Sequence, residues 1–277
     1  MKNKYLRDVC IILVSFRSKK KVKETINSIN KNISVILVEN SMDISLKKQL
    51  EKKYKNVEVI IPKSNNGQGE AFNLAARKAN KKYLLFLDMD IKITTLEIMK
   101  LVKKAIDIKN FGVITPKIRH QNYDKLKIEK KKNQDLYKVW FNTGCVMLVK
   151  KSTMKKVNYF DKRIFLYYEE TDFYKRCINA NLPVFMYDKV MITNPKTYSI
   201  DTKFSHDYIK IRNWHYCWSK FYYYKKHYNY FIGLQKTLPN LIKAIRKIIT
   251  HLLMFRFKEI SYFYAEISGL ISSYLNI

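Results

Sequence analysis

The sequence YLLFLDMD at residues 83–90 decides the fold, because a short apolar run ends there in two aspartates. Such a run is typical of a strand that is buried on both faces of a parallel sheet. Side chains alternate along an extended chain, so Asp88 and Asp90 point to the same side. Two carboxylates at a strand end can bind Mg²⁺ or Mn²⁺ and leave positions for phosphate oxygens, which indicates a nucleoside diphosphate site. A simple turn is the alternative, because Asp is common in turns and so short a motif also occurs by chance.

Strand and helix patterns alternate on both sides of this segment. Apolar runs predict strands at residues 9–14, 35–38, 57–61 and 83–87, and helices fit at about 19–30, 44–54 and 70–80. This alternation predicts an α/β fold with right-handed crossovers. In such sheets, ligands bind beyond the carboxyl ends of the strands. The residues that follow those ends are Ser15, Phe16, Arg17, Glu39, Asn40, the loop 65–69, Asp88 and Asp90.

The second half of the chain is less regular. It predicts strands at 111–116, 139–149, 184–187 and 190–193, a Lys-rich loop or hairpin at 123–135, and a helix at 167–180. From about residue 204 the composition becomes aromatic, basic and helical. We therefore expect an α/β domain over residues 1–205 and a helical extension over residues 206–277.

The charge is strongly positive, with 54 Lys and Arg against 23 Asp and Glu, a net charge of +31. Such a surface attracts nucleic acid, anionic lipid or phosphorylated glycans. A Lys-, Asn- and Ile-rich chain also fits an AT-rich genome, and no zinc-finger or RNP-type signature is present. A basic nucleic-acid-binding protein thus remains the binding-module alternative.

The four cysteines lack metal-ligand spacing and predict buried thiols in a reducing compartment. No apolar run indicates a signal peptide or a membrane span.

Two further motifs are weak alone. The loop at 65–73, NNGQGEAFN, puts glycines at a helix start and can accommodate a nucleotide or form an ordinary turn. The segment 167–172, YYEETD, begins a helix with acids, which the helix dipole explains. A carboxylate beside aromatic rings is also desolvated, and its raised pKa makes it a general base near neutral pH.

Over about residues 9–220 the chain resembles family 2 glycosyltransferases of the GT-A fold, in the pattern of their bacterial rhamnosyltransferase-like branch. In that family Glu39 and Glu170 stand where Asp is usual, and Asn194 stands where a His is frequent. The matching segments are 12–16, 38–41, 65–73, 88–90, 142–145, 160–161, 165–172, Arg176, Arg212, Asn213 and Lys220.

The resemblance implies a mixed, mostly parallel sheet flanked by helices, followed by the helical extension. It implies an inverting, metal-dependent hexosyl- or deoxyhexosyltransferase that uses a nucleotide-sugar donor and Mn²⁺ or Mg²⁺. The implied acceptor is a hydroxyl of a bacterial cell-surface glycan: lipopolysaccharide or lipooligosaccharide, capsule, or a lipid-linked oligosaccharide. A GT-A nucleotidyltransferase is the remaining alternative, although the loop at 15–19 lacks the glycines usual there.

The resemblance also assigns roles to residues. Asp90, helped by Asp88 and Asn194, is the implied metal site, and Glu170 is the implied general base, with Asp172 and Glu169 as alternatives. The implied donor-binding residues are Ser15, Phe16, Arg17, Glu39, Asn65, Gly67, Gly69, Asn73, Asp88 and Lys196. The implied acceptor- and sugar-binding residues are Thr143, Gly144, Tyr168 and Arg212.

The last part of the chain contains an amphipathic helix with Pro239 near its start. It packs on the rest of the protein, or it lies on an anionic membrane, where Trp214, Trp218 and the tyrosines at 222–224 would sit at the interface, and the two roles can coexist. The second alternative predicts a protein on the cytoplasmic face of the inner membrane. The apolar stripe is Leu241, Ile242, Ile245, Ile248, Ile249, Leu252 and Leu253, and the basic residues largely outside it are Lys243, Arg246, Lys247 and His251.

Overall fold

The computed structural model describes residues 4–119, 121, 135–195 and 205–277. The chain divides into two compact units. The first contains Met1–Lys162 and Glu170–Ser199, and the second contains Arg163–Glu169 and Ile200–Ile277. The predicted domain boundary after residue 205 stays a prediction.

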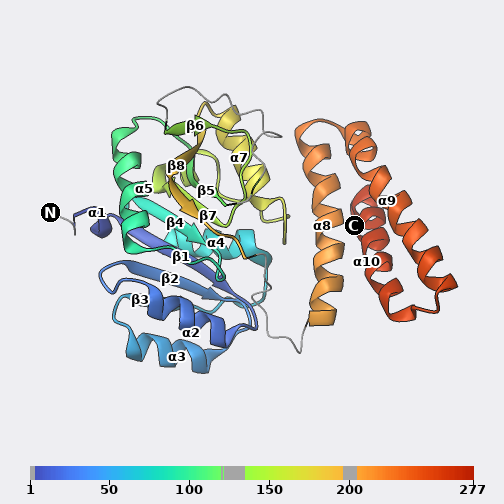
Figure 1. Ribbon diagram of the computed structural model, residues 1–277, viewed down its shortest axis with the longest axis horizontal. Coiled ribbons are helices and arrows are strands. Elements are labelled where there is room, and N and C mark those ends of the chain that lie inside the picture. Colours follow the sequence, from blue (N-terminus) through green and yellow to red (C-terminus); the bar gives the residue numbers. More distant parts are fainter. Residues whose placement is uncertain (1–3, 120, 122–134, 196–204) are drawn as a thin grey trace. The chain divides into compact units, whose positions relative to one another are not determined.

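The first unit is built on a mixed eight-stranded sheet with the order β3-β2-β1-β4-β7-β5-β8-β6 (Figure 1). β1 pairs in parallel with β2 and β4, and β5 pairs in parallel with β8. β7 runs antiparallel between β4 and β5, and β6 is antiparallel at the edge. The α/β prediction is confirmed. The strands are β1 Val9–Ser15, β2 Ser34–Glu39, β3 Val57–Ile60, β4 Tyr83–Leu87, β5 Val113–Ile118, β6 Leu136–Lys138, β7 Val146–Lys150 and β8 Val184–Ile192.

Helices cover both faces of the sheet, so the central strands are apolar on both sides. Ile11 and Leu85 belong to one apolar cluster and Ile12 and Phe86 to the other, as the alternation of side chains requires. Residues of α2, α3 and α5 complete the first cluster, and residues of α4, α6 and α7 complete the second. These helices and the short first one are α1 Lys4–Arg7, α2 Lys19–Ser28, α3 Ile44–Lys53, α4 Gly67–Lys78, α5 Thr95–Asp107, α6 Lys151–Lys156 and α7 Glu169–Asn179.

Two strand predictions in the second half were wrong in their bounds. The predicted strand at 139–149 begins only at Val146, and the buried Asn142 side chain holds the preceding segment outside the ladder. Its Nδ2 donates to Thr115 Oγ1 at 2.7 Å and to the Pro116 carbonyl at 3.2 Å. The two short strands predicted at 184–187 and 190–193 form one strand, β8, whose register with β5 shifts after Pro116. The predicted loop at 123–135 lies outside the described residues except for residue 135.

The second unit consists of three helices, α8 Ser205–His227, α9 Tyr230–Leu253 and α10 Phe257–Leu275, and the segment 163–169. Phe165 stacks on His215 of α8 with ring centroids 4.3 Å apart, and Ser219 Oγ donates to the Leu166 carbonyl at 3.0 Å. The predicted helical character of this region is confirmed. Of the described helices, none combines the length and the apolar character needed to cross a membrane.

Small residues set the spacing of these three helices. A Cβ on Gly269 of α10 would lie 2.3 Å from the Trp214 carbonyl oxygen of α8, and one on Gly233 of α9 would lie 2.7 Å from the Phe221 ring. Thr237 and Ala244 on α9 are also fully buried. The helices therefore approach closely through their smallest side chains.

The four cysteines, Cys10, Cys145, Cys177 and Cys217, are buried and unpaired, as predicted.

We predict that Gly269→Ala destabilises the protein, although Ala favours a helix over Gly by about 0.5–1 kcal/mol. The added methyl group meets backbone rather than a movable side chain, and overpacking of this kind typically costs about 1–3 kcal/mol. Thermal unfolding measures the effect, with the half-buried Ser272→Ala on the same helix as the control. An unchanged or higher melting temperature for Gly269→Ala contradicts the close approach of α8 and α10.

Candidate active site at the carboxyl edge of the sheet

The predicted site residues of the first unit gather at one edge of the sheet. β1, β2, β4 and β8 all point the same way, so their carboxyl ends lie along this edge. β7 is antiparallel, so its amino end, with Thr143 and Gly144 before it, lies there too. Asn194 follows β8 at this edge and is half-buried, whereas Lys196 lies outside the described residues.

A buried carboxylate joins the ends of β1 and β2. Glu39 is 1% exposed and accepts hydrogen bonds from the Ser15 hydroxyl and, at 2.7 Å, from the Ser41 backbone N–H. The Ser41 hydroxyl in turn accepts from the Arg17 backbone N–H. The Arg17 guanidinium lies over the Phe16 ring at 5.1 Å and is exposed. At these strand ends the buried Glu39 carboxylate is thus held in place by hydrogen bonds, and Phe16 and Arg17 lie beside it along the chain.

The glycine loop closes over the neighbouring part of the edge. Gly67 has φ 85°, which suits glycine, and its N–H donates to Asn65 Oδ1 at 3.0 Å. Its carbonyl accepts from Asn40 Nδ2 at 3.4 Å, which ties the start of α4 to the end of β2. Helix α4 begins at Gly67, three residues before its predicted start at residue 70, so its first turn is part of the site.

Asn73 holds the other side of α4 in place. Its amide forms two hydrogen bonds with the backbone of Phe160, at 3.0 Å to the carbonyl and 2.9 Å from the N–H. It also donates to Glu70 Oε2 at 2.8 Å and is 1% exposed. The Asn73 amide therefore fixes the helix through contacts within the protein. Asn65, Gly67 and Gly69 belong to the loop and the first turn of the helix.

Three carboxylates meet beyond β4. Burial, together with the negative charges of Asp90 and Glu170, raises the pKa of Asp88 to about 7. A hydrogen bond from Gln68 Nε2 to Asp88 Oδ1, at 3.2 Å, opposes this shift. The Asp88 backbone N–H donates to the Cys145 carbonyl at 3.0 Å, so the end of β4 is fixed to the start of β7. Gln68 was missed by the sequence reasoning because only folding brings it near Asp88.

Glu170 lies directly against Gly144. A Cβ on Gly144 would come within 2.8 Å of Glu170 Cβ and Cγ, so only glycine leaves room for this side chain. Burial raises the pKa of Glu170, although the backbone N–H groups of Glu170 and Thr171 partly oppose the shift. The resulting arrangement places a carboxylate with elevated proton affinity at the same edge as the aspartate pair.

The other two acidic residues of this segment are held differently. Asp172 is fully buried and accepts from Arg176 Nε at 2.8 Å, while Arg176 also donates to the Val157 carbonyl. Glu169 is buried as well. Asp172 therefore forms a structural ion pair one turn along α7, which leaves Glu170 as the carboxylate beside Gly144 and Asp88.

Tyr168 and Arg212 belong to the second unit. The Tyr168 ring lies 5.8 Å from Tyr216 and 5.4 Å from Tyr223, and the Arg212 guanidinium lies 6.0 Å from the Tyr167 ring. Tyr167 and Tyr168 both have positive φ, at 64° and 70°. Two bulky residues in this conformation are uncommon and persist only where packing enforces them.

The acidic residues beyond β4 could supply only a few of the ligands of a divalent ion. Across the described part of the chain, no group of three or more His, Cys, Asp or Glu side chains is arranged to hold a metal. Burial and the charges of Asp90 and Glu170 raise the pKa of Asp88, and a bound cation would oppose this shift by stabilising the ionised carboxylates. Hard carboxylate oxygens suit Mg²⁺ or Mn²⁺, with water and phosphate as the other ligands. The residues present therefore fit an ion that Asp88 and Asp90 would hold together with a phosphorylated ligand.

Comparison with known proteins gives consistent results. A family model described as glycosyl transferase family 2 matches residues 10–172. The low-salt glycan biosynthesis hexosyltransferase Agl10 of Haloferax volcanii is 22% identical over 200 residues, which span 65% of this chain and 64% of that protein. The chain thus spans somewhat less than two thirds of the length of this relative.

Two solved structures share the fold. The mannosyltransferase PcManGT from Pyrobaculum calidifontis, in complex with GDP-Man and Mn²⁺, superposes with a TM-score of 0.62 at 12% identity over 98% of this chain and 88% of its own. TarS residues 1–349 of S. aureus, in complex with UDP, give a TM-score of 0.54 at 14% identity over 98% and 92%. At these identities the likeness concerns the fold, and it confirms the GT-A-like arrangement.

We predict that Asp88 makes stability fall as pH rises. Its pKa is raised from 3.8 to about 7, so the folded chain keeps a proton that the unfolded chain loses. The contribution of Asp88 to the free energy of unfolding is therefore fully present below about pH 4 and is lost as the pH rises through about 7. Each unit of pKa shift corresponds to about 1.4 kcal/mol. Asp88→Asn should flatten this dependence and raise the melting temperature at pH 8, measured in buffer with a chelator.

Asp43→Asn is the matched control, because the Leu46 backbone N–H lowers the pKa of Asp43. Its contribution has the opposite sign, since it is present at neutral pH and is lost as acid protonates the carboxylate. An Asp88→Asn profile that parallels the wild type between pH 4 and 8 would show that the three carboxylates do not repel one another in the folded protein.

Proposed function

The chain belongs to glycosyl transferase family 2, and we propose that it is an inverting glycosyltransferase that uses a nucleotide-sugar donor. The observation that carries this proposal is the meeting of Asp88, Asp90 and Glu170 at the carboxyl edge of the sheet. An aspartate pair suits a donor diphosphate, and a separate carboxylate of high proton affinity suits an acceptor hydroxyl. One site would thus serve both requirements of sugar transfer.

The donor would lie across the ends of β1, β2 and β4. Ser15 and Ser41 orient the Glu39 carboxylate so that its free lone pairs can accept hydrogen bonds from the nucleoside. Gln68 orients Asp88, and Asp88 with Asp90 would hold the divalent ion. When bound, this ion neutralises charge on the departing nucleoside diphosphate. Arg17 and Lys196 are the proposed cationic contacts of the donor.

Glu170 is the proposed general base. Burial raises its pKa, which favours proton uptake, and Gly144 leaves room for its side chain. The acceptor hydroxyl would lose its proton to Glu170 as its oxygen attacks the anomeric carbon, and the bond to the diphosphate would break on the opposite face. The configuration at that carbon is then inverted. Asp172 is a weaker candidate because Arg176 already occupies its Oδ2.

The donor and acceptor classes are proposed from the relatives. PcManGT is in complex with GDP-Man and Mn²⁺, and Agl10 is a hexosyltransferase of glycan biosynthesis. We therefore propose transfer of a hexose or deoxyhexose, in the manner of the rhamnosyltransferase-like branch, to a bacterial cell-surface glycan. Thr143, Gly144, Tyr168 and Arg212 are the proposed sugar and acceptor contacts. A lipid-linked acceptor would place the enzyme on the cytoplasmic face of the inner membrane.

Replacing Glu170 tests the mechanism. Glu170→Gln keeps the shape of the side chain and removes its proton acceptor, so turnover should fall about 100-fold or more. Donor affinity, measured by calorimetry, should stay within about twofold, because Glu170 is not a proposed donor contact. Asp172→Asn should instead lower the melting temperature, because Arg176 loses a buried charged partner. If Asp172→Asn loses turnover while Glu170→Gln keeps it, the two roles are exchanged.

Replacing Asp90 tests the metal. Asp90→Ala should abolish the Mn²⁺-dependent part of nucleoside diphosphate binding in calorimetry, because the ion keeps only one of its two proposed carboxylates. The fold should persist, and Asp107→Ala, at the far end of α5, is the matched control. Equal diphosphate binding by wild type with Mn²⁺ and with a chelator would contradict the proposed metal site.

A further inference from the structure

Most of the apolar stripe of α9 is exposed, and only Leu241 and Ile248 of the stripe are half-buried. Within the second unit, α9 packs through Gly233, Thr237 and Ala244, whereas large apolar side chains point away from that face. They recur at intervals of three or four residues, as one helical face requires. We call them the apolar row: Leu238, Ile242, Ile245, Ile249, Leu252 and Leu253, which are 44–77% exposed.

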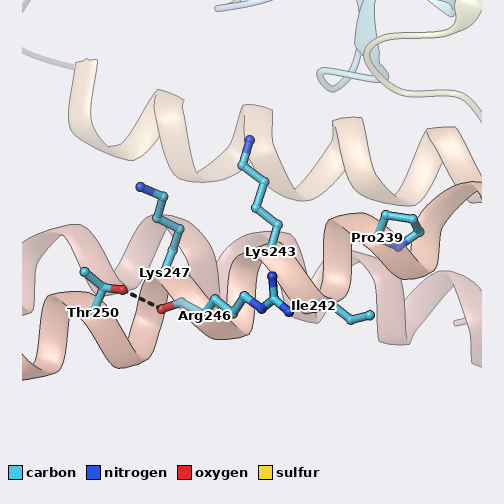
Figure 2. Close-up of a pocket in the computed structure, with 6 residues that line it drawn as sticks. All are labelled: Pro239, Ile242, Lys243, Arg246, Lys247 and Thr250. Carbon is cyan, nitrogen blue, oxygen red and sulfur yellow. Dashed lines mark hydrogen bonds between the residues drawn. The ribbon is translucent and has the colours of Figure 1, made fainter.

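A basic strip runs beside the apolar row. Lys243, Arg246 and Lys247 are exposed and line a groove of about 460 Å³ together with Pro239, Ile242 and Thr250 (Figure 2). Lys243 and Lys247 extend from the same side of the helix. Helix α9 contains no Asp or Glu, and among the described residues none of these three cations forms an ion pair. Glu266 of α10 interacts electrostatically with Lys243, so the strip presents a positive charge that is only partly compensated.

The turn from α9 to α10 adds exposed aromatic residues. Phe255 is 80% exposed and Phe257 62%, and Met254 beside them is also exposed. Phe255 adopts φ 56°, a left-handed conformation that suits Gly or Asn better than a bulky residue. The chain thus carries an aromatic side chain where both exposure to water and backbone conformation disfavour it. Arg256 and Lys258 flank Phe257 and are exposed.

We infer that this surface docks on an anionic phospholipid bilayer. Phe255, Phe257 and the apolar row would enter the boundary between headgroups and acyl chains, and the basic strip would contact lipid phosphates. This deepens the membrane association proposed above, and it does not depend on sugar transfer. A second copy of the chain fits less well, because a two-fold interface would bring the strip against its own like charges. A nucleic acid would leave the apolar row in water.

Vesicle flotation tests the basic strip. The full chain should float with vesicles of phosphatidylcholine and phosphatidylglycerol but not with phosphatidylcholine alone, and added salt should weaken the binding. Each basic residue near such a surface is worth about fivefold in affinity, so Lys243→Gln, Arg246→Gln and Lys247→Gln together should cost about 100-fold. Lys48→Gln, Lys52→Gln and Lys55→Gln, three exposed lysines of the first unit, are the charge-matched control.

Phe255→Asn tests insertion without loss of the fold. Asn tolerates the left-handed conformation, so the melting temperature should stay or rise, while vesicle affinity falls about tenfold or more because an aromatic side chain no longer leaves water. Leu96→Asn, which replaces a residue 61% exposed in the first unit, is the control. All variants should keep wild-type transfer to a water-soluble acceptor, which separates failed docking from failed catalysis. Equal binding to neutral vesicles, absence of vesicle binding, or a dimer in light scattering that Phe255→Asn dissociates would overturn the inference.

Discussion

The antiparallel pairing of β7 with β4 is the constraint on which the site depends. It matches Phe86 with Met147 and Leu87 with Val146, and it continues in the hydrogen bond from Asp88 N–H to the Cys145 carbonyl. Gly144 therefore lies beside the aspartate pair and leaves the space that Glu170 occupies. One strand reversed within a largely parallel sheet thus brings residues about 80 positions apart into one acidic site.

Packing like charges together has an electrostatic consequence that suits the proposed reaction. Burial, followed by the charges of Asp90 and Glu170, raises the pKa of Asp88, and a divalent ion bound there would favour the ionised carboxylate. Glu170 stays desolvated beside this pair and keeps a high proton affinity. In the proposed reaction the same site would bind a cation through Asp88 and Asp90 and keep Glu170 as a base, because the carboxylates differ in their surroundings.

The second unit obeys a different packing rule. Its helices contact one another at Gly233, Gly269 and Ala244. The small side chains therefore lie in the helix contacts, and the large apolar side chains of α9 are exposed. The sequence pattern of α9 allowed either a packed or an interfacial helix. The structure shows that α9 packs within the second unit through its small residues and leaves the apolar row exposed on another face, and bilayer docking through that exposed face is our proposal.

The sequence by itself determined the α/β alternation, the strand ends and the aspartate pair, because these follow from local periodicity and from short motifs. The resemblance also pointed to Glu170 as the base, with Asp172 and Glu169 as alternatives. Only the tertiary structure showed that Arg176 pairs with Asp172 and that Gly144 lies against Glu170. The late start of β7 and the contact of Gln68 with Asp88 could not be predicted from the sequence either. Such contacts join residues distant in sequence, and no local propensity records the burial and charge that they create.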